Sequence, residues 1–298
     1  MVSILIPVFN YDCTELVKEL IRSCILARIN YEIIIGNDCS SDLSVVDAIN
    51  RLALNDNCRV LNEEKNIGRA FVLNKMSQYA KYPFLLIIDS DARLVGDDFI
   101  EKYIKVAVDH DVVCGGIEVR VQDRKSDNLL RYRYEYAATK CRALNYRKKH
   151  PYEKFSTFNL MIRKSVFDSI KFHSRCYQYG YEDTVLGLDL MKRGIEVLHI
   201  DNPLIHTGID SNSSFLFKTQ QSLQVLKNLD LFYLENIRLS RVAMRLQRNK
   251  MIWLIVLWHK LFGRIEYGSL IKYPKINVFY LYKLGYFCCL INKKSKKK

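Results

Sequence analysis

The stretch L-L-I-I-D-S-D, residues 85–91, joins four large apolar residues directly to a pair of aspartates. A continuous apolar run of this length is typical of a strand that is buried on both faces of a sheet. Ligands of such sheets collect just beyond the carboxyl ends of the strands, and Asp89, Ser90 and Asp91 stand at that place. The segment therefore predicts a buried strand with an acidic site at its end.

Apolar runs alternate with helical patterns through the first half of the chain. Strands are expected at 2–8, 31–36, 59–61 and 84–88, and helices at 13–27 and 69–80. This alternation predicts an α/β fold with a parallel sheet covered by helices on both faces. Asp38 follows the second strand and is expected at the same sheet edge as Asp89. The glycine-rich dinucleotide fingerprint is missing after the first strand, which argues against a nicotinamide or flavin enzyme.

The pattern changes after Val95. Further strands are expected at 114–119, 158–162 and 195–198, and a helix at 182–193 that stops at Gly194. Beyond residue 207 the chain is expected to be mostly helical.

Two acidic motifs suggest chemistry, and each also has a structural explanation. The carboxylates of Asp89 and Asp91 suit magnesium or manganese, but Asp and Ser also favour solvated turns. Asp183 opens a helix, where it would accept a proton from an attacking hydroxyl or simply favour the helix dipole. A lone histidine such as His206 is more often a satisfied polar residue than a metal ligand.

Six motifs occur together in a fixed order. They are S-I-L-I-P-V-F-N (3–10), N-D-C-S-S-D (37–42), N-I-G-R-A (66–70), L-L-I-I-D-S-D-A (85–92), Y-G-Y-E-D-T-V-L-G-L-D-L-M-K-R-G (179–194) and I-H-T-G (205–208). This order resembles the family-2 glycosyltransferases over about residues 1–210. The resemblance implies the GT-A fold, a Rossmann-like mixed sheet with helices on both faces. It places a nucleotide-sugar half at about 1–95 and an acceptor half at about 96–210, followed by a helical extension at 211–298.

The resemblance also implies roles for single residues. Asp38 matches the aspartate that contacts the base, usually uracil, and Pro7, Val8 and Phe9 match the segment that lines it. The remaining matches are Asp89 and Ser90 for the nucleotide, Asp91 with Asp89 and His206 for the metal, Asp183 for the catalytic base, and Glu182 for positioning the acceptor. Two departures stand out: Asn37 replaces a frequent aspartate, and Leu73-Asn74 replaces a frequent Arg-Asn pair. Arg69 is the nearest cation that would bind the diphosphate in its place.

The activity implied by the resemblance is metal-dependent, inverting transfer of a sugar from a nucleotide diphosphate, usually UDP, to an acceptor hydroxyl. A glycan or lipid-linked acceptor in bacterial surface polysaccharide synthesis fits this reading. One alternative is a sugar nucleotidyltransferase, although the glycine-rich, lysine-bearing loop of such enzymes is missing after the first strand. The other is a nucleic-acid-binding protein, although residues 1–240 are almost neutral, so no nucleic-acid partner is expected.

The positive charge of the chain is concentrated at its end. Residues 241–298 hold 14 basic residues and one acidic residue, Glu266, within a total net charge of +14. Tryptophans and tyrosines are interspersed among these cations, a pattern that predicts contact with an anionic membrane surface. The alternative is a helical appendage packed on the catalytic domain.

The compartment is expected to be reducing. The 9 cysteines are odd in number and show no C-x-x-C spacing. The apolar run at 3–8 lacks a basic leader and a cleavage site, so a first strand is expected there instead of a signal peptide. Together these features predict a cytoplasmic protein that is peripheral at the inner face of the membrane.

Overall fold

The computed structural model describes residues 1–120, 124–153, 155–176 and 179–294. The chain forms two compact units. The first comprises Met1–Arg120, Thr139–Tyr177 and Glu182–Gly208, and the second comprises Val121–Ala138, Gln178–Tyr181 and Ile209–Lys298. Each unit is described by itself below.

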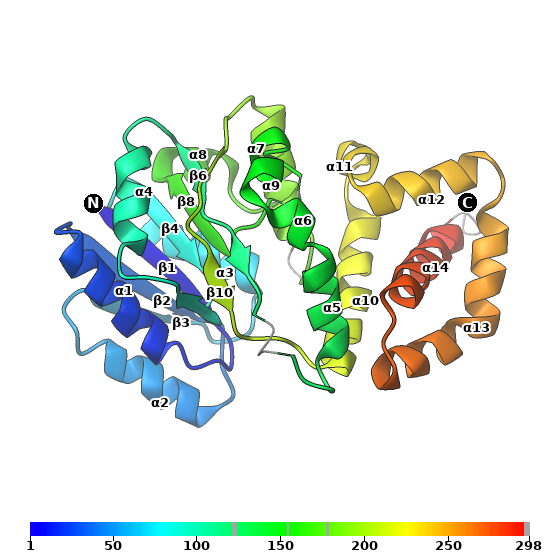
Figure 1. The fold of residues 1–298 in the computed structure, drawn as a ribbon, viewed down its shortest axis with the longest axis horizontal. Helices are drawn as coiled ribbons and strands as arrows, with labels where there is room; N and C mark the ends of the chain where they lie inside the picture. The colour runs from blue at the N-terminus through cyan, green and yellow to red at the C-terminus, as the bar shows by residue number, and fades with distance from the viewer. Residues whose placement is uncertain (121–123, 154, 177–178, 295–298) are drawn as a thin grey trace. The chain divides into compact units, whose positions relative to one another are not determined.

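A seven-stranded mixed sheet forms the centre of the first unit (Figure 1). Its order is β3 (Cys58–Asn62), β2 (Tyr31–Asn37), β1 (Val2–Val8), β4 (Phe84–Ile88), β8 (Asn159–Arg163), β6 (Val112–Cys114) and β9 (Leu198–His199). The first four strands run parallel, and β8 runs antiparallel to both β4 and β6. The expected mixed α/β fold is therefore confirmed.

The apolar strands are continuous because both faces of the sheet are covered. Along β1, Ile4 and Ile6 face a core shared with α1 (Thr14–Leu26), α2 (Leu43–Leu52) and α4 (Phe99–Ala107). Leu5 faces the opposite core, which is shared with α3 (Arg69–Tyr79), α8 (Lys164–Ile170) and α9 (Glu182–Lys192). Alternate side chains of one strand thus enter two different cores. The buried polar residue of β1, Ser3, donates a hydrogen bond to Oε1 of Glu32 at 2.6 Å, which offsets the cost of its burial.

A small second sheet lies next to the acidic turn that follows β4. It consists of β5 (Ala92–Leu94), β10 (Leu204–His206) and β7 (Ile117–Glu118), in that order. β10 runs antiparallel to β5 with His206 opposite Ala92. This register places a residue from far along the chain beside Asp91.

Two expected strands need correction. The strand expected at 114–119 is divided between β6 and β7, which belong to different sheets. The division falls at Gly115-Gly116, because Gly116 has φ +105° and Gly115 packs so closely on Tyr103 that a β-carbon would overlap its hydroxyl. The strand expected at 195–198 is displaced to β9, Leu198–His199. Two short helices, α6 (Thr139–Arg142) and α7 (Leu144–Lys149), complete this unit.

The second unit is helical, as expected for the C-terminal region. It contains α5 (Leu129–Ala137), α10 (Asn212–Asn228), α11 (Leu231–Asn236), α12 (Arg238–Arg248), α13 (Ile252–Lys272) and α14 (Ile276–Lys294). α14 packs against both α10 and α13 (Figure 1) around a core that includes Phe215, Leu270 and Phe279. Among the helices of the described residues, none combines the length and the hydropathy required to cross a bilayer.

Candidate active site

The first acidic turn, after β2, holds its aspartate on backbone amides. The N–H groups of Ile67 and Gly68 donate to the two carboxylate oxygens of Asp38, at 2.7 and 2.9 Å. The Asp38 residue is only 4% exposed. Burial raises the pKa of Asp38, and the two amide hydrogen bonds oppose this rise. Asp38 therefore fixes the turn that leads into α3, directly before Arg69.

Arg69, the first residue of α3, connects the two acidic motifs of the sequence. Its Nε and Nη2 donate to Oδ1 of Asp89, at 2.8 and 2.5 Å. Its Nη1 donates to Oγ1 of Thr157 at 2.9 Å and lies 3.4 Å from Oδ1 of Asp183. The side chains of Arg69, Asp89 and Asp183 are 22%, 26% and 27% exposed. The guanidinium thus brings together carboxylates that are 94 positions apart in the chain.

The charges around Arg69 are unbalanced. Burial lowers the pKa of Arg69, but the carboxylates of Asp89, Asp183 and Glu182 together raise it further than burial lowers it. Burial also raises the pKa of Asp89 to about 6, and the charges of Asp91 and Asp183 add to this rise while Arg69 opposes it. The cluster therefore carries more negative charge than its one arginine neutralises, which favours binding of a cation.

Asp183 stands in the first turn of α9 and accepts hydrogen bonds from two hydroxyl groups. Ser156 Oγ donates to Asp183 Oδ2 at 2.9 Å, and Thr157 Oγ1 donates to Oδ1. Because a carboxylate has about four lone-pair sites, these bonds and Arg69 leave it capacity for a further donor. The sequence reading missed Ser156 and Thr157. Their only signal was a pair of hydroxyl residues immediately before the strand at 158–162.

Asp91 faces a different partner. Nε2 of His206 lies 3.0 Å from Oδ2 of Asp91. The Thr207 hydroxyl donates to the Asp91 carbonyl oxygen at 2.7 Å, and a β-carbon on Gly208 would overlap the Asp91 carboxylate. The antiparallel pairing of β10 with β5 therefore delivers His206, Thr207 and Gly208 together to Asp91.

The expected metal ligands are only partly assembled. No three His, Cys, Asp or Glu side chains within the described ranges form a group that would hold a metal ion. Asp91 and His206 lie together, but the Asp89 carboxylate points to Arg69 instead of His206. Its charge-assisted hydrogen bonds with the guanidinium hold it there. The Asp91–His206 pair, with one oxygen and one nitrogen donor, fits a divalent ion that takes its remaining ligands from water and substrate phosphates.

The other predicted residues lie at the ends of β1 and β4 and at the start of α9. Pro7 and Val8 are buried within β1, whereas the Phe9 side chain is 51% exposed at its end. Ser90 is half-buried between the two aspartates, and Glu182 precedes Asp183 in α9.

Asn10, which the sequence reading did not single out, ties the first loop to the turn after β2. Its Oδ1 accepts from the N–H groups of Ser41 and Asp42 at 2.8 and 3.0 Å. The loop after β1 and the turn that carries Asp38 are therefore held together.

Comparison with known proteins identifies the family of the chain. The sequence model of glycosyl transferase family 2 matches residues 3–171, more than half of the chain. The chain belongs to this family. The matched range includes most of β1, the Asp38 turn, Arg69, the aspartates after β4 and Thr157. It favours glycosyl transfer over nucleotidyl transfer and nucleic-acid binding.

Solved glycosyltransferases share the fold at low sequence identity. The mannosyltransferase PcManGT from Pyrobaculum calidifontis, in complex with GDP-Man and Mn²⁺, has a TM-score of 0.57 at 13% identity, over 100% of this chain and 88% of its own. S. aureus TarS 1–349, in complex with UDP-GlcNAc, has a TM-score of 0.54 at 14% identity, over 100% of this chain and 92% of its own. Both support the GT-A type of fold for this family-2 member. The search of curated proteins by sequence returned no significant match.

Proposed function

We propose that this glycosyltransferase moves a sugar from a nucleotide diphosphate to an acceptor hydroxyl with inversion at the anomeric carbon. We take UDP as the first nucleotide to test. The observation that carries the proposal is the contact of Arg69 with both Asp89 and Asp183. Through it the expected donor-binding motif and the expected catalytic base face the same space. The family and the nucleotide sugars bound by its structural relatives, GDP-Man and UDP-GlcNAc, support a nucleotide-sugar donor.

The donor diphosphate would be bound at the Arg69 and Asp91 side of the site. Asp91 and His206 would hold a manganese or magnesium ion, which supplies Lewis-acid stabilisation of the leaving diphosphate when bound. Arg69 would attract the phosphates through its positive charge, because its five N–H groups already donate to Asp89, Thr157 and Asp183. Phe9 offers an exposed aromatic face for the base, and direct contact of Asp38 with the base stays a prediction from the resemblance.

The acceptor would approach from the side of α9. Its hydroxyl oxygen attacks the anomeric carbon, the bond from that carbon to the diphosphate oxygen breaks, and the hydroxyl proton passes to Asp183. Ser156 and Thr157 would keep the Asp183 carboxylate oriented for this step, and Glu182 would position the acceptor. A single displacement of this kind inverts the configuration of the sugar.

The acceptor class is proposed from the resemblance and from the charge of the chain. A glycan on a lipid carrier, used for a bacterial surface polysaccharide, would be met at the cytoplasmic face of a membrane. The concentration of positive charge in residues 241–298 supports this location, because anionic lipids attract basic segments.

The proposal is tested with a panel of UDP-, GDP- and dTDP-sugars, each with and without manganese. We expect one donor to raise the thermal midpoint when manganese is present, and to release its nucleoside diphosphate in a metal-dependent reaction. Release of pyrophosphate from a nucleoside triphosphate and a sugar phosphate would indicate nucleotidyl transfer instead. Failure of every donor to shift the midpoint would contradict the proposal.

A further inference from the structure

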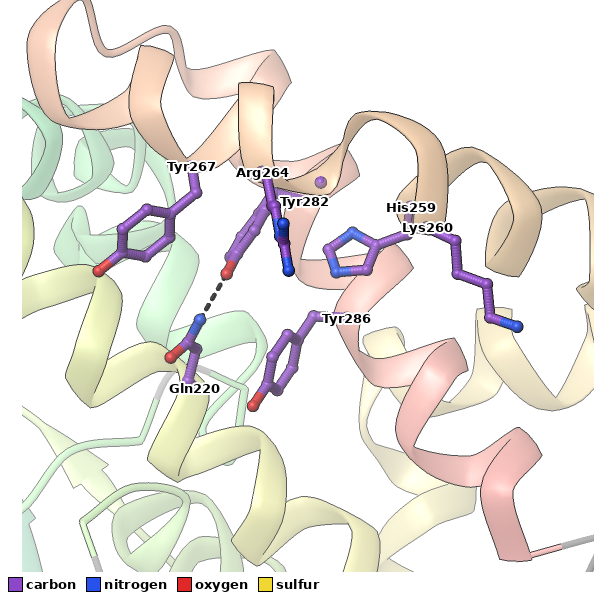
Figure 2. Close-up of a pocket in the computed structure, with 8 residues that line it drawn as sticks. Gln220, His259, Lys260, Arg264, Tyr267, Tyr282 and Tyr286 are labelled. Atoms are coloured by element: carbon purple, nitrogen blue, oxygen red, sulfur yellow. Dashed lines mark hydrogen bonds between the residues drawn. The ribbon is translucent and has the colours of Figure 1, made fainter.

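The helical unit contains a cavity that the proposed transfer reaction does not use. Its volume is about 400 Å³, and it is lined by side chains of α10, α13 and α14 (Figure 2). Tyr267, Tyr282 and Tyr286 form much of its wall, and Gln220 of α10 donates to the Tyr282 hydroxyl at 2.5 Å. The lining is therefore aromatic and rich in hydrogen-bonding groups.

Two exposed cations belong to the same cavity. Lys260 and Arg264 stand one turn apart on α13, and neither makes an ion pair with any residue in the described part of the chain. In Figure 2 Lys260 extends away from the three tyrosine rings. Arg264, an unpaired cation beside hydroxyl and amide groups, therefore suits a phosphate, which accepts several hydrogen bonds at once.

A buried carboxylate, Glu266, lies close to the lining residue His259 but does not itself line the cavity. Glu266 is buried, and its Oε1 accepts from Nε1 of Trp258 at 2.8 Å. Its Oε2 lies 3.7 Å from Nδ1 of His259, a residue that lines the cavity. Both of these atoms are buried without a hydrogen-bond partner among the described residues. Among the described residues, Glu266 therefore forms its ion pair with His259 and not with Lys260 or Arg264.

An apolar stripe runs along the solvent face of α13, beside these cations. We call it the α13 stripe; its members are 40–67% exposed, namely Trp253, Leu254, Leu257, Trp258, Leu261, Phe262 and Ile265. Their spacing of one, three and four residues places them on one side of the helix, opposite the buried Val256, Gly263 and Leu270. Lys260 and Arg264 occupy the edge of this side, next to Leu257 and Leu261. A soluble protein rarely exposes a continuous apolar surface of this kind without a partner.

The preceding helix supplies further positive charge. Arg238, Arg241, Arg245 and Arg248 are exposed at heptad-like spacing along one side of α12. None of the four forms an ion pair within the ranges that the structure describes. An apolar helix face adjoined by unpaired cations and flanked by indole rings is complementary to the interface of an anionic bilayer.

We infer that Arg264, which lines the cavity with Tyr267, Tyr282 and Tyr286 and also borders the α13 stripe, binds the phosphate of an anionic membrane lipid at the rim of the cavity, while the α13 stripe enters the apolar layer from the other side of that residue. The helix of 21 residues would lie in the plane of the interface, because none of the described helices is suited to cross a bilayer. The inference deepens the proposed function, on which it rests for the lipid-linked acceptor class, by naming the surface that meets the lipid.

The test measures sedimentation of the full-length protein with vesicles of phosphatidylcholine, alone and with added phosphatidylglycerol. We expect binding to the anionic vesicles only. Arg264→Gln should lower the affinity roughly 30-fold, since it removes a charge and a hydrogen bond to the phosphate. Lys272→Gln is the matched control, because it removes an exposed cation from the last turn of the same helix outside the cavity. Lys272→Gln should lower the vesicle affinity about fivefold, which is the general effect of removing one charge near an anionic surface.

A second pair of variants tests the α13 stripe. Leu261→Gln should lower vesicle affinity about tenfold or more, because a leucine side chain no longer enters the apolar layer. Leu54→Gln, at an 84% exposed leucine of the first unit, should leave vesicle binding unchanged. Thermal melts of all four variants show whether each remains folded.

Several outcomes would overturn the inference. Equal losses for Arg264→Gln and Lys272→Gln would show general electrostatic attraction without a phosphate site. Stabilisation by inorganic phosphate without vesicle binding would indicate a soluble phosphate ligand, and a dimer that Leu261→Gln dissociates would assign the stripe to a second copy of the chain. Release of nucleoside diphosphate is measured on the same preparations. If the unmodified protein releases nucleoside diphosphate but does not bind anionic vesicles, this inference alone is contradicted. If it binds the vesicles but releases no nucleoside diphosphate, the proposed function alone is contradicted.

Discussion

The two acidic turns at the edge of the main sheet look alike in sequence and differ in structure. Both follow a buried parallel strand, one with Asp38 and the other with Asp89 and Asp91. Asp38 is buried and bound by two backbone N–H groups. Asp89 and Asp91 are partly exposed and face side chains, Arg69 and His206 respectively. Because its partners are backbone N–H groups, Asp38 acts as a scaffold residue. The side-chain partners of Asp89 and Asp91 can rotate away, so these carboxylates are able to exchange Arg69 or His206 for a ligand.

The difference shows how the site depends on the first turn. Asp38 fixes Ile67 and Gly68, and the next residue is Arg69, the cation that meets Asp89 and Asp183. Gly68 has φ +88°, a conformation that permits the sharp entry into α3. The buried aspartate therefore positions the arginine on which the exposed aspartates converge. Substitutions in the two turns should consequently differ in kind as well as in size.

The largest effect on turnover is expected at Asp183. This residue is linked to the second turn because Arg69 contacts both Asp183 and Asp89. Asp183→Asn should lower turnover by about 100-fold or more while donor binding stays nearly unchanged, because a side-chain amide cannot act as the base that removes the proton of the attacking hydroxyl. Steady-state rates with the identified donor and titration of the nucleotide measure the two effects. Asp109→Asn, an exposed carboxylate of the same unit, is the control. Normal turnover of Asp183→Asn would remove Asp183 from the role of base.

A similarly large effect is expected at Asp91. Asp91→Asn should lower turnover on the order of 100-fold and raise the manganese concentration needed for half-maximal rate. The thermal midpoint without metal should hardly change, since Asp91 is partly exposed. If Asp91→Asn lowered the thermal midpoint as much as Asp38→Ala does, Asp91 would also be a scaffold residue and the contrast between the two turns would fail.

A smaller effect is expected at Gly208, which touches no proposed substrate group. Gly208→Ala should weaken manganese binding by about 10- to 100-fold, because the added methyl group displaces the Asp91 carboxylate from His206. The titration of rate against manganese measures this change. Gly194→Ala is a control for loss of a glycine, since no atom lies near that β-carbon, although its φ of +67° adds strain. Unchanged metal affinity in Gly208→Ala would contradict the Asp91–His206 site.

The smallest direct effect on chemistry is expected at Asp38, where stability should respond instead. Asp38→Ala leaves the N–H groups of Ile67 and Gly68 without their acceptor, and should lower the free energy of unfolding by about 1–3 kcal/mol. Asp38→Asn keeps one acceptor oxygen, so its free energy of unfolding should lie between those of the wild type and Asp38→Ala. The cost of burying the charge, seen in the raised pKa of Asp38, disappears in both variants and reduces the loss. Denaturant unfolding measures the series, and equal stability of all three proteins would refute the scaffold role.

Much of the fold was predictable because strand and helix periodicities are local. The strand at 84–88 and the helix beginning at 182 were expected and are present. The strand expected at 114–119 was wrong, because its division depends on how closely Tyr103 approaches Gly115. Ser156 and Thr157 were missed for a similar reason. Hydroxyl residues are common, and only their position against Asp183 distinguishes these two.

The sequence by itself determined the family, the alternation of strands and helices, and the acidic residues that follow β2 and β4, since each is written in contiguous residues. Only the tertiary structure decided the partners of those residues. Arg69 bonds to Asp89 and reaches Asp183, and His206 faces Asp91, through strand pairings and helix packing that join distant segments. Carboxylates of one residue type thus receive different tasks, because burial and partners set the chemistry of an ionisable group.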